Sequence, residues 1–225
     1  MASPAIITHK LYLLLEFVAI FFVVPLAVRW QWFSVPLVVI PLYLLCIYAV
    51  IWLLFRGRVK SQQLWLGMSI TSEKLALKTI AKRFVLVVVL VWWVVYAFYP
   101  EKLLAFPLHH PVYWLFFVVL YPVFSVYPQE LLFRAFFFQR YADIFPDNGF
   151  MIMLSVLMFA FMHIVFANGI VILCTLIGGY FFADTYARTG SLRVVCLEHS
   201  LYGSVVFTFG LGEFFVLDAA KSLLM

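Results

Sequence analysis

Eight runs of apolar residues divide this sequence, and their length constrains the fold more than any other feature does. A helix that crosses a bilayer needs about 20 predominantly apolar residues, and most of the runs approach or exceed that length. The runs cover residues 11–28, 35–55, 84–99, 112–138, 150–167, 169–184, 194–209 and 214–224. The sequence therefore predicts an all-α fold, a polytopic membrane helical bundle of about eight transmembrane helices.

Composition supports the same fold class and excludes several functions. Apolar residues make up 67% of the chain and charged residues 11%, whereas a soluble domain has about 45–50% and about 25%. A water-soluble surface needs more polar groups than this chain has. A soluble enzyme, a nucleic-acid-binding domain and a disordered protein are therefore excluded. The expected surroundings are a lipid bilayer, with no nucleic acid as partner.

The net charge of +5 comes from a single segment. Residues 56–83 hold seven basic residues and one acidic residue, so 7 − 1 = +6, while the rest of the chain carries 8 − 9 = −1. Basic loops mark the cytoplasmic side of a membrane protein, so we interpret this charge as a topology signal and not as an anion site. Within it, residues 69–83 have the pattern of an amphipathic helix on the cytoplasmic surface.

This orientation predicts a multi-pass protein of the cell membrane with cytoplasmic N- and C-termini. The sequence shows no internal repeat, which argues against an inverted-repeat transporter. It has no cleavable signal-peptide pattern, since the first apolar run is long and contains Glu16. Its three cysteines stand alone and form no CxxC pair, so neither a disulfide framework nor a thiolate metal site is expected.

Ionisable side chains inside apolar runs are costly, so each is a candidate functional residue. The candidates are Glu16, Glu130, Arg134, His163, Asp184, Glu198 and His199. Glu130 and Arg134 are four residues apart and can pair on one helix face. One carboxylate and two imidazoles that converge in a buried cavity can activate water and stabilise an oxyanion.

The same residues also fit a metal site, because histidine and carboxylate ligands suit zinc. If a metal is bound, we expect Glu130, His163 and His199 to hold it. No HExxH spacing is present, which lowers the weight of this alternative. We therefore predict no cofactor and keep zinc as the alternative.

The order Glu130-x-x-x-Arg134, Phe159-x-x-x-His163 and a later His199, each in its own run, resembles the CPBP family. These are CAAX proteases and bacteriocin-processing enzymes, also described as Abi or Rce1-like intramembrane proteases. The resemblance implies a bundle of typically eight spans and hydrolysis of a peptide bond near the membrane surface. It also divides one integral membrane domain into N-terminal helices at 1–110 and a catalytic core at 111–225.

Two positions depart from the family pattern. The first motif usually reads EExxxR, with the first glutamate as base, but Gln129 stands at that position here. A neutral amide cannot take a proton from water. Either Glu130 is the base, or Glu198 supplies the carboxylate from another helix, or the protein is inactive. The family often has Asn, Asp or Ser four residues after the second histidine as an oxyanion partner, and Gly203 stands there.

The leading functional interpretation is an intramembrane endopeptidase in which a carboxylate and two histidines activate water. Its candidate catalytic residues are Glu130, His163, His199, Arg134, Gln129 and Glu198. Its expected partner is a membrane-anchored peptide or protein substrate, while its oligomeric state cannot be read from the sequence. The alternative is an inactive scaffold or bacteriocin-immunity protein that binds a peptide in the same cavity. A small transporter is a third class.

Overall fold

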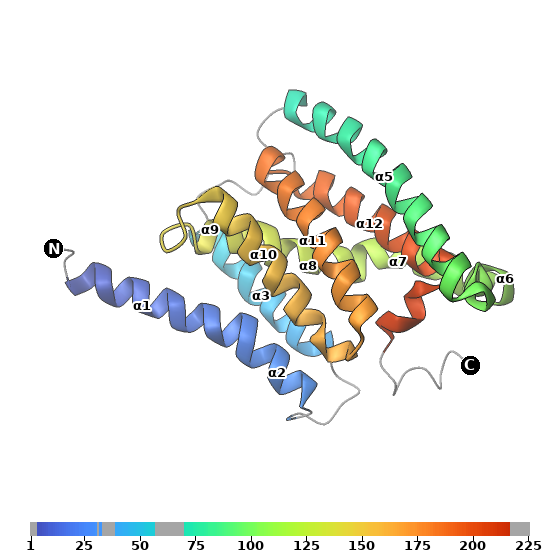
Figure 1. Ribbon diagram of the computed structural model, residues 1–225. Coiled ribbons are helices and arrows are strands. Elements are labelled where there is room, and N and C mark those ends of the chain that lie inside the picture. The colour runs from blue at the N-terminus through green and yellow to red at the C-terminus, as the bar shows by residue number, and fades with distance from the viewer. Residues whose placement is uncertain (1–3, 31, 33–38, 57–69, 217–225) are drawn as a thin grey trace.

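A computed structural model describes residues 4–30, 32, 39–56 and 70–216. All regular elements within these residues are helices, which confirms the predicted fold class (Figure 1). The longer elements are α1 (Pro4–Val18), α3 (Val39–Arg56), α5 (Ile70–Phe98), α7 (Pro111–Tyr121), α10 (Asn148–Met162), α11 (Gly169–Thr189) and α12 (Leu192–Phe209). Between them lie the shorter α2 (Val24–Arg29), α6 (Ala105–His109), α8 (Tyr127–Glu130) and α9 (Phe137–Arg140).

The helices α10, α11 and α12 lie side by side at the centre of the bundle (Figure 1). On one flank, the segment that joins α1 to α2 packs against α10, and on the other flank α5 packs along α12. The segment from α7 to α9 contacts both α12 and α3. This segment therefore lies between the N-terminal helices and the central ones, where its side chains can meet those of α12.

Two of the membrane-length helices contain π-helical turns close to prolines. The first includes Ala19–Val23, just before Pro25, and the long helix between α7 and α9 includes Pro122–Val126 and Leu131–Phe136. Proline has no N–H to give to the preceding turn, so the local hydrogen-bond pattern has to change. The chain nevertheless remains helical through Pro122 and Pro128.

Within the described part of the chain, five helices are long and apolar enough to cross a membrane, and they cover Ile6–Arg29, Thr71–Phe98, Pro111–Arg140, Asn148–Phe166 and Gly169–Thr189. The helix Ile40–Arg56 is apolar but shorter. The span predicted at 194–209 corresponds to α12, which is not among these helices. It is less apolar than they are, since it contains Arg193, Glu198 and His199. Most of the predicted eighth span falls on residues 217–225, which lie outside the described residues. Its described residues, 214–216, begin at the end of a short 3-10 helix, Leu211–Phe215.

The helix predicted at 69–83 is present in its described part, but it continues into the next predicted span and does not end at residue 83. Residues 70–98 form one continuous helix, α5, because no proline or glycine interrupts them. Its first turns are also docked on the bundle: Glu73 and Ile80 are buried, and Glu73 pairs with Arg193 of α12. The basic residues 57–69 that precede it lie outside the described residues.

Different ion pairs lie at the two ends of the bundle. At one end Glu73 pairs with Arg193, and Arg140 at the end of α9 pairs with Glu16 near the end of α1. At the other end Lys102 pairs with Glu213. His9 near the start of α1 lines a hollow together with Arg140. The start of α1, the end of α9, the start of α5 and the start of α12 thus lie toward the end that carries most of the described basic residues, as the sequence predicts (Figure 1).

Candidate active site

The centre of the bundle contains a carboxylate–imidazole pair. Nδ1 of His199 on α12 lies 2.7 Å from Oε1 of Glu130 at the end of α8. Glu130 is completely buried and His199 is 6% exposed. Since an ionised carboxylate can only accept, Nδ1 carries the proton and donates it, which leaves Nε2 without one in the neutral ring. We refer to Glu130 and His199 as the dyad.

Arg134 lies beside the dyad and is also completely buried. Its Nε is 3.2 Å from Oε2 of Glu130, which confirms the pairing expected from the i,i+4 spacing. Its Nη2 donates to the carbonyl of Gly179 at 3.3 Å, and its guanidinium lies over the ring of Phe159 with 4.8 Å to the centroid. Arg134 thus places a buried cation next to the carboxylate of the dyad.

The orientation of the His199 ring is fixed by aromatic neighbours. It stacks on Phe182 of α11, with 4.3 Å between centroids and 16° between planes. Phe159 of α10 meets it edge-on at 5.7 Å, and Tyr121 at the end of α7 does so at 6.0 Å. Three helices therefore hold the imidazole in one orientation, with Nδ1 toward Glu130.

The second histidine, His163, joins this group through a shared phenylalanine. The ring of Phe159 lies 4.7 Å from His163 and 5.7 Å from His199, measured between centroids. Nδ1 of His163 lies 2.7 Å from the backbone carbonyl of Phe159. Because a carbonyl only accepts, Nδ1 is the donor here too, and Nε2 of His163 is an acceptor in the neutral ring.

Gln129, at the position of the expected first glutamate, is directed away from the dyad's hydrogen bond. Its Nε2 donates to Oγ of Ser125 at 2.8 Å. Its Oε1 is buried and has no hydrogen-bond partner among the described residues. A buried carbonyl oxygen without a partner is unfavourable in the protein alone, so it is available to a water or a peptide N–H.

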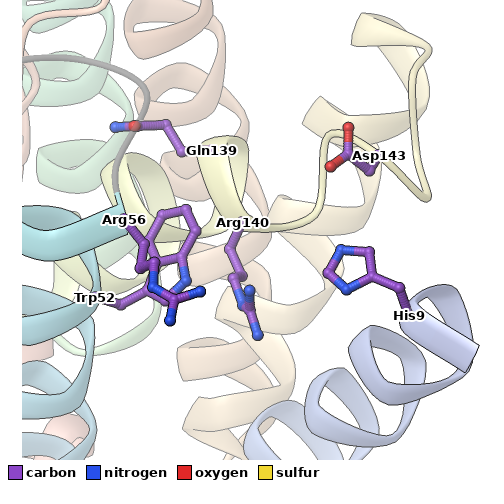
Figure 2. Close-up of a pocket in the computed structure, with 6 residues that line it drawn as sticks. All are labelled: His9, Trp52, Arg56, Gln139, Arg140 and Asp143. Carbon is purple, nitrogen blue, oxygen red and sulfur yellow. The ribbon is translucent and has the colours of Figure 1, made fainter. Parts of the chain in front are cut away.

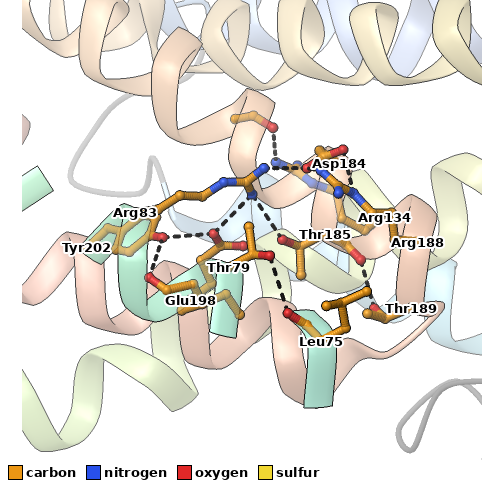
Figure 3. A network of polar contacts seen from close by, with 12 residues as sticks. Leu75, Thr79, Arg83, Arg134, Asp184, Thr185, Arg188, Thr189, Glu198 and Tyr202 are labelled. Atoms are coloured by element: carbon orange, nitrogen blue, oxygen red, sulfur yellow. Dashed lines mark hydrogen bonds and ion pairs between the residues drawn. The ribbon is translucent and has the colours of Figure 1, made fainter. Parts of the chain in front are cut away.

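Glu198 belongs to a different group of charges, shown in Figure 3. Its Oε1 accepts from the Tyr202 hydroxyl at 2.9 Å and lies 3.5 Å from Nη1 of Arg83. Arg83 of α5 also pairs with Asp184 of α11 at 2.5 Å, and Asp184 pairs in turn with Arg188. We refer to these five residues as the Arg83 network. The structure thus brings Glu130, rather than Glu198, to His199.

Glu16 contributes to neither group. It accepts two hydrogen bonds from Arg140, at 2.7 and 2.5 Å, and one from Tyr48 at 2.9 Å. It also accepts one at 3.2 Å from Tyr141, and burial together with the nearby Glu16 carboxylate raises the pKa of the Tyr141 phenol. These bonds tie α1, α3 and the end of α9 together.

A hollow of about 200 Å³ lies next to Arg140 at this end of the bundle. Figure 2 shows its lining residues, which are His9, Trp52, Arg56, Gln139, Arg140 and Asp143. They come from α1, α3, α9 and the loop that follows α9. The hollow is therefore separate from the dyad, and it holds none of the predicted catalytic residues.

The candidate zinc ligands were Glu130, His163 and His199. Among the described residues, no group of three or more His, Cys, Asp and Glu side chains is arranged to hold a metal ion. The two imidazoles instead use Nδ1 for hydrogen bonds to a carboxylate and to a backbone carbonyl.

Sequence reasoning missed Tyr121, Phe182 and Arg83. Tyr121 and Phe182 appear in the sequence as ordinary aromatic residues in apolar runs, and only packing places them against His199. Arg83 was counted with the basic topology signal. The sequence does hold one signal for Arg83: no proline or glycine interrupts residues 70–98, which predicts that Arg83 lies within one continuous helix.

Comparison with known families supports the resemblance found in the motifs. Residues 111–205 match the family model described as type II CAAX prenyl endopeptidase Rce1-like. The matched segment contains the dyad, Arg134 and His163, so the CPBP resemblance is confirmed for this part of the chain. The match supports a protease, and with the five apolar helices it indicates a multi-pass membrane protein.

Two wider comparisons give no match. No curated protein matches the chain. No solved structure matches it either.

Proposed function

We propose that this protein is an intramembrane endopeptidase that activates water at the Glu130–His199 dyad. The observation that carries the proposal is the 2.7 Å contact between these side chains, which lie 69 residues apart in the sequence. A buried carboxylate bonded to Nδ1 of a histidine fixes the ring and stabilises its charged form. The match of residues 111–205 to a protease family supports this interpretation.

In the proposed reaction, Nε2 of His199 takes a proton from water while the water oxygen forms a bond to the carbonyl carbon of the substrate. The carbonyl π electrons move onto the oxygen, which becomes an oxyanion. The oxyanion then collapses, the C–N bond breaks, and the leaving amine receives the proton from His199. Glu130 stays ionised and stabilises the imidazolium between the two steps.

This assignment differs in one respect from the first of the three alternatives that the sequence left open, in which Glu130 itself is the base. Oε1 of Glu130 is already bonded to Nδ1, so we propose that the carboxylate acts through the imidazole. His163 is proposed to hold the attacking water, because its free Nε2 is an acceptor. Arg134 is proposed to hold the Glu130 carboxylate in position through the contact of its Nε with Oε2. The reaction as written uses no metal.

For the substrate, we propose a membrane-anchored protein or peptide. The family description names CAAX prenyl endopeptidases, so a lipid-modified C-terminus is the first substrate class to test. The buried position of the dyad also favours a substrate that arrives within the membrane, since bulk solvent does not reach Glu130.

The test compares cleavage by the wild type with cleavage by isosteric variants of two buried glutamates, Glu130 and Glu198. The purified protein in liposomes is offered a fluorogenic peptide that ends in a farnesylated CAAX sequence, and separately an unprenylated peptide on a transmembrane anchor. Glu130→Gln is expected to lower kcat by roughly 10²-fold or more, the usual contribution of acid–base catalysis. His163→Ala and His199→Ala should also lower it, whereas the exposed Glu101→Gln serves as control.

The other outcomes separate the alternatives. If Glu198→Gln abolishes cleavage and Glu130→Gln does not, the base is Glu198. If the Glu130, His163 and His199 variants all cleave the reporter as fast as the wild type does, a catalytic role for the dyad is refuted. Binding of either peptide without cleavage by the wild type favours the inactive scaffold or immunity protein. Loss of cleavage with 1,10-phenanthroline, restored by zinc, favours the metal alternative.

A further inference from the structure

The hydroxyl of Tyr121 lies beside Gly203 of α12, in the space where any other residue would have its Cβ atom. A Cβ atom at Gly203 would collide with the Tyr121 hydroxyl oxygen and would lie 2.6 Å from Cε1 and 2.7 Å from Cζ of its ring. Real Cβ atoms are not found so close to a ring, so only glycine permits this contact. The tip of Tyr121 therefore rests directly on the backbone of α12.

This position lies on the His199 side of α12. Gly203 follows His199 by four residues, which places the two on the same face about one helical turn apart. The Tyr121 ring also meets the His199 ring edge-on, with 6.0 Å between centroids and 81° between planes. The phenol is thus held next to the imidazole that we propose to take the proton from water.

The ring of Tyr121 is held firmly, while its hydroxyl is not engaged. It stacks on Phe117 at 4.8 Å and contacts Phe207 at 5.9 Å. Two buried tyrosines bond a carboxylate, Tyr202 with Glu198 and Tyr141 with Glu16. The Tyr121 hydroxyl has no such bond to another described residue, and a phenol enclosed among aromatic rings normally finds a partner.

The proposed reaction needs a hydrogen-bond donor that the histidines do not supply. Both imidazoles use Nδ1–H elsewhere, so their neutral Nε2 atoms can only accept. Arg134 is completely buried and lies against Phe159 and Phe182. A substrate carbonyl that gains negative charge requires a positioned N–H or O–H donor. Tyr121 has the one side-chain hydroxyl that directly adjoins the His199 ring among the described aromatic contacts.

We propose that Tyr121, from the space opened by Gly203, donates a hydrogen bond to the carbonyl oxygen of the scissile peptide as it becomes an oxyanion. This inference rests on the proposed protease function. The proton stays on the phenol throughout, so the steps and the balance of the reaction are unchanged. Glycine at position 203 is then not a lost oxyanion partner, because a residue from α7 takes that role.

The test replaces the hydroxyl and keeps the ring. Tyr121→Phe is expected to lower kcat on the farnesylated or anchored reporter by about 10²-fold, with KM within roughly threefold, since the donor acts on the transition state. Tyr113→Phe on the same helix is the matched control, because Tyr113 is 67% exposed. Gly203→Ala should lower kcat similarly by displacing the phenol, and the double variant should fall little further.

A second measurement does not depend on the folding of these variants. Replacing Tyr121 with 3,5-difluorotyrosine keeps the ring and makes the phenol more acidic. A phenolate cannot donate, so activity should be lost at a lower pH than in the wild type, on the alkaline side of the profile. The same replacement at position 113 should leave the profile unchanged.

The outcomes separate this inference from the function on which it rests. If Glu130→Gln abolishes cleavage but Tyr121→Phe retains the kcat of Tyr113→Phe, the role of Tyr121 is refuted and the protease function stands. A rise in KM at unchanged kcat would also overturn it, because this indicates uniform substrate binding. If the wild type cleaves neither reporter, both the function and the role of Tyr121 are refuted.

Discussion

At the scale of single residues, the site depends on which nitrogen of each histidine is engaged. His199 and His163 both use Nδ1, one toward a carboxylate and one toward a backbone carbonyl. This common arrangement leaves two Nε2 acceptors and makes a separate donor necessary. The chemistry of the site is thereby set by two short contacts rather than by residue composition alone.

Gln129 gives a prediction at this scale. Because its amide bonds Ser125 and not the dyad, Gln129→Glu is expected to change kcat less than about tenfold. Wild type and variant are compared on the same liposome reporter, with Glu130→Gln as the inactive reference. Cleavage that appears only in Gln129→Glu would instead identify the wild type as an inactive relative whose base has been lost.

At the scale of helices, α5 is attached to the central helices by the Arg83 network. Arg83 is 15% exposed at its side chain, pairs with Asp184 and Glu198, and lies over the Phe181 ring at 4.7 Å. These contacts reach both α11 and α12. The basic segment of the sequence therefore supplies a structural cation as well as a topology signal.

Arg83→Ala should loosen this attachment. It leaves Glu198 without its cation in a buried position, which we expect to cost on the order of 3 kcal/mol of folding free energy. Thermal unfolding in detergent measures the effect, and the exposed neighbour Lys82→Ala is the control, expected to change stability by less than about 0.5 kcal/mol. Equal melting temperatures for the two variants would contradict a structural role for Arg83.

At the scale of the whole molecule, the charges are divided between the two ends of the bundle. Glu73, Arg140 and Arg193 lie at the end that carries most of the basic residues, and Lys102 with Glu213 lies at the other. The positive-inside rule then predicts that the first end faces the cytoplasm. The division of the chain at residue 110 remains a prediction.

Cysteine labelling measures this orientation. After the three native cysteines are replaced by serine, Lys74→Cys and Lys102→Cys are each treated with a membrane-impermeant maleimide in intact cells. We expect labelling at position 102 before permeabilisation and at position 74 only after it. The reverse pattern would show that the basic end of the bundle faces outward.

The sequence by itself determined the membrane class, the helices and the short set of buried ionisable residues, because hydrophobicity and spacing along one chain fix these properties. It also predicted the pairing of Glu130 with Arg134, which needs only one turn of helix. Whether Glu130 or Glu198 serves His199 could not be predicted. Adjacent residues on a helix point about 100° apart, so Glu198 and His199 face different neighbours.

Only tertiary packing decided those neighbours. The segment from α7 to α9 brings Glu130 to His199 across 69 residues, and α5 brings Arg83 to Glu198 across 115. The contact of Tyr121 with Gly203 has the same origin, since an absent side chain matters only where another helix fills its place. Distances between helices depend on how all the side chains pack together, and no local pattern in the sequence encodes them.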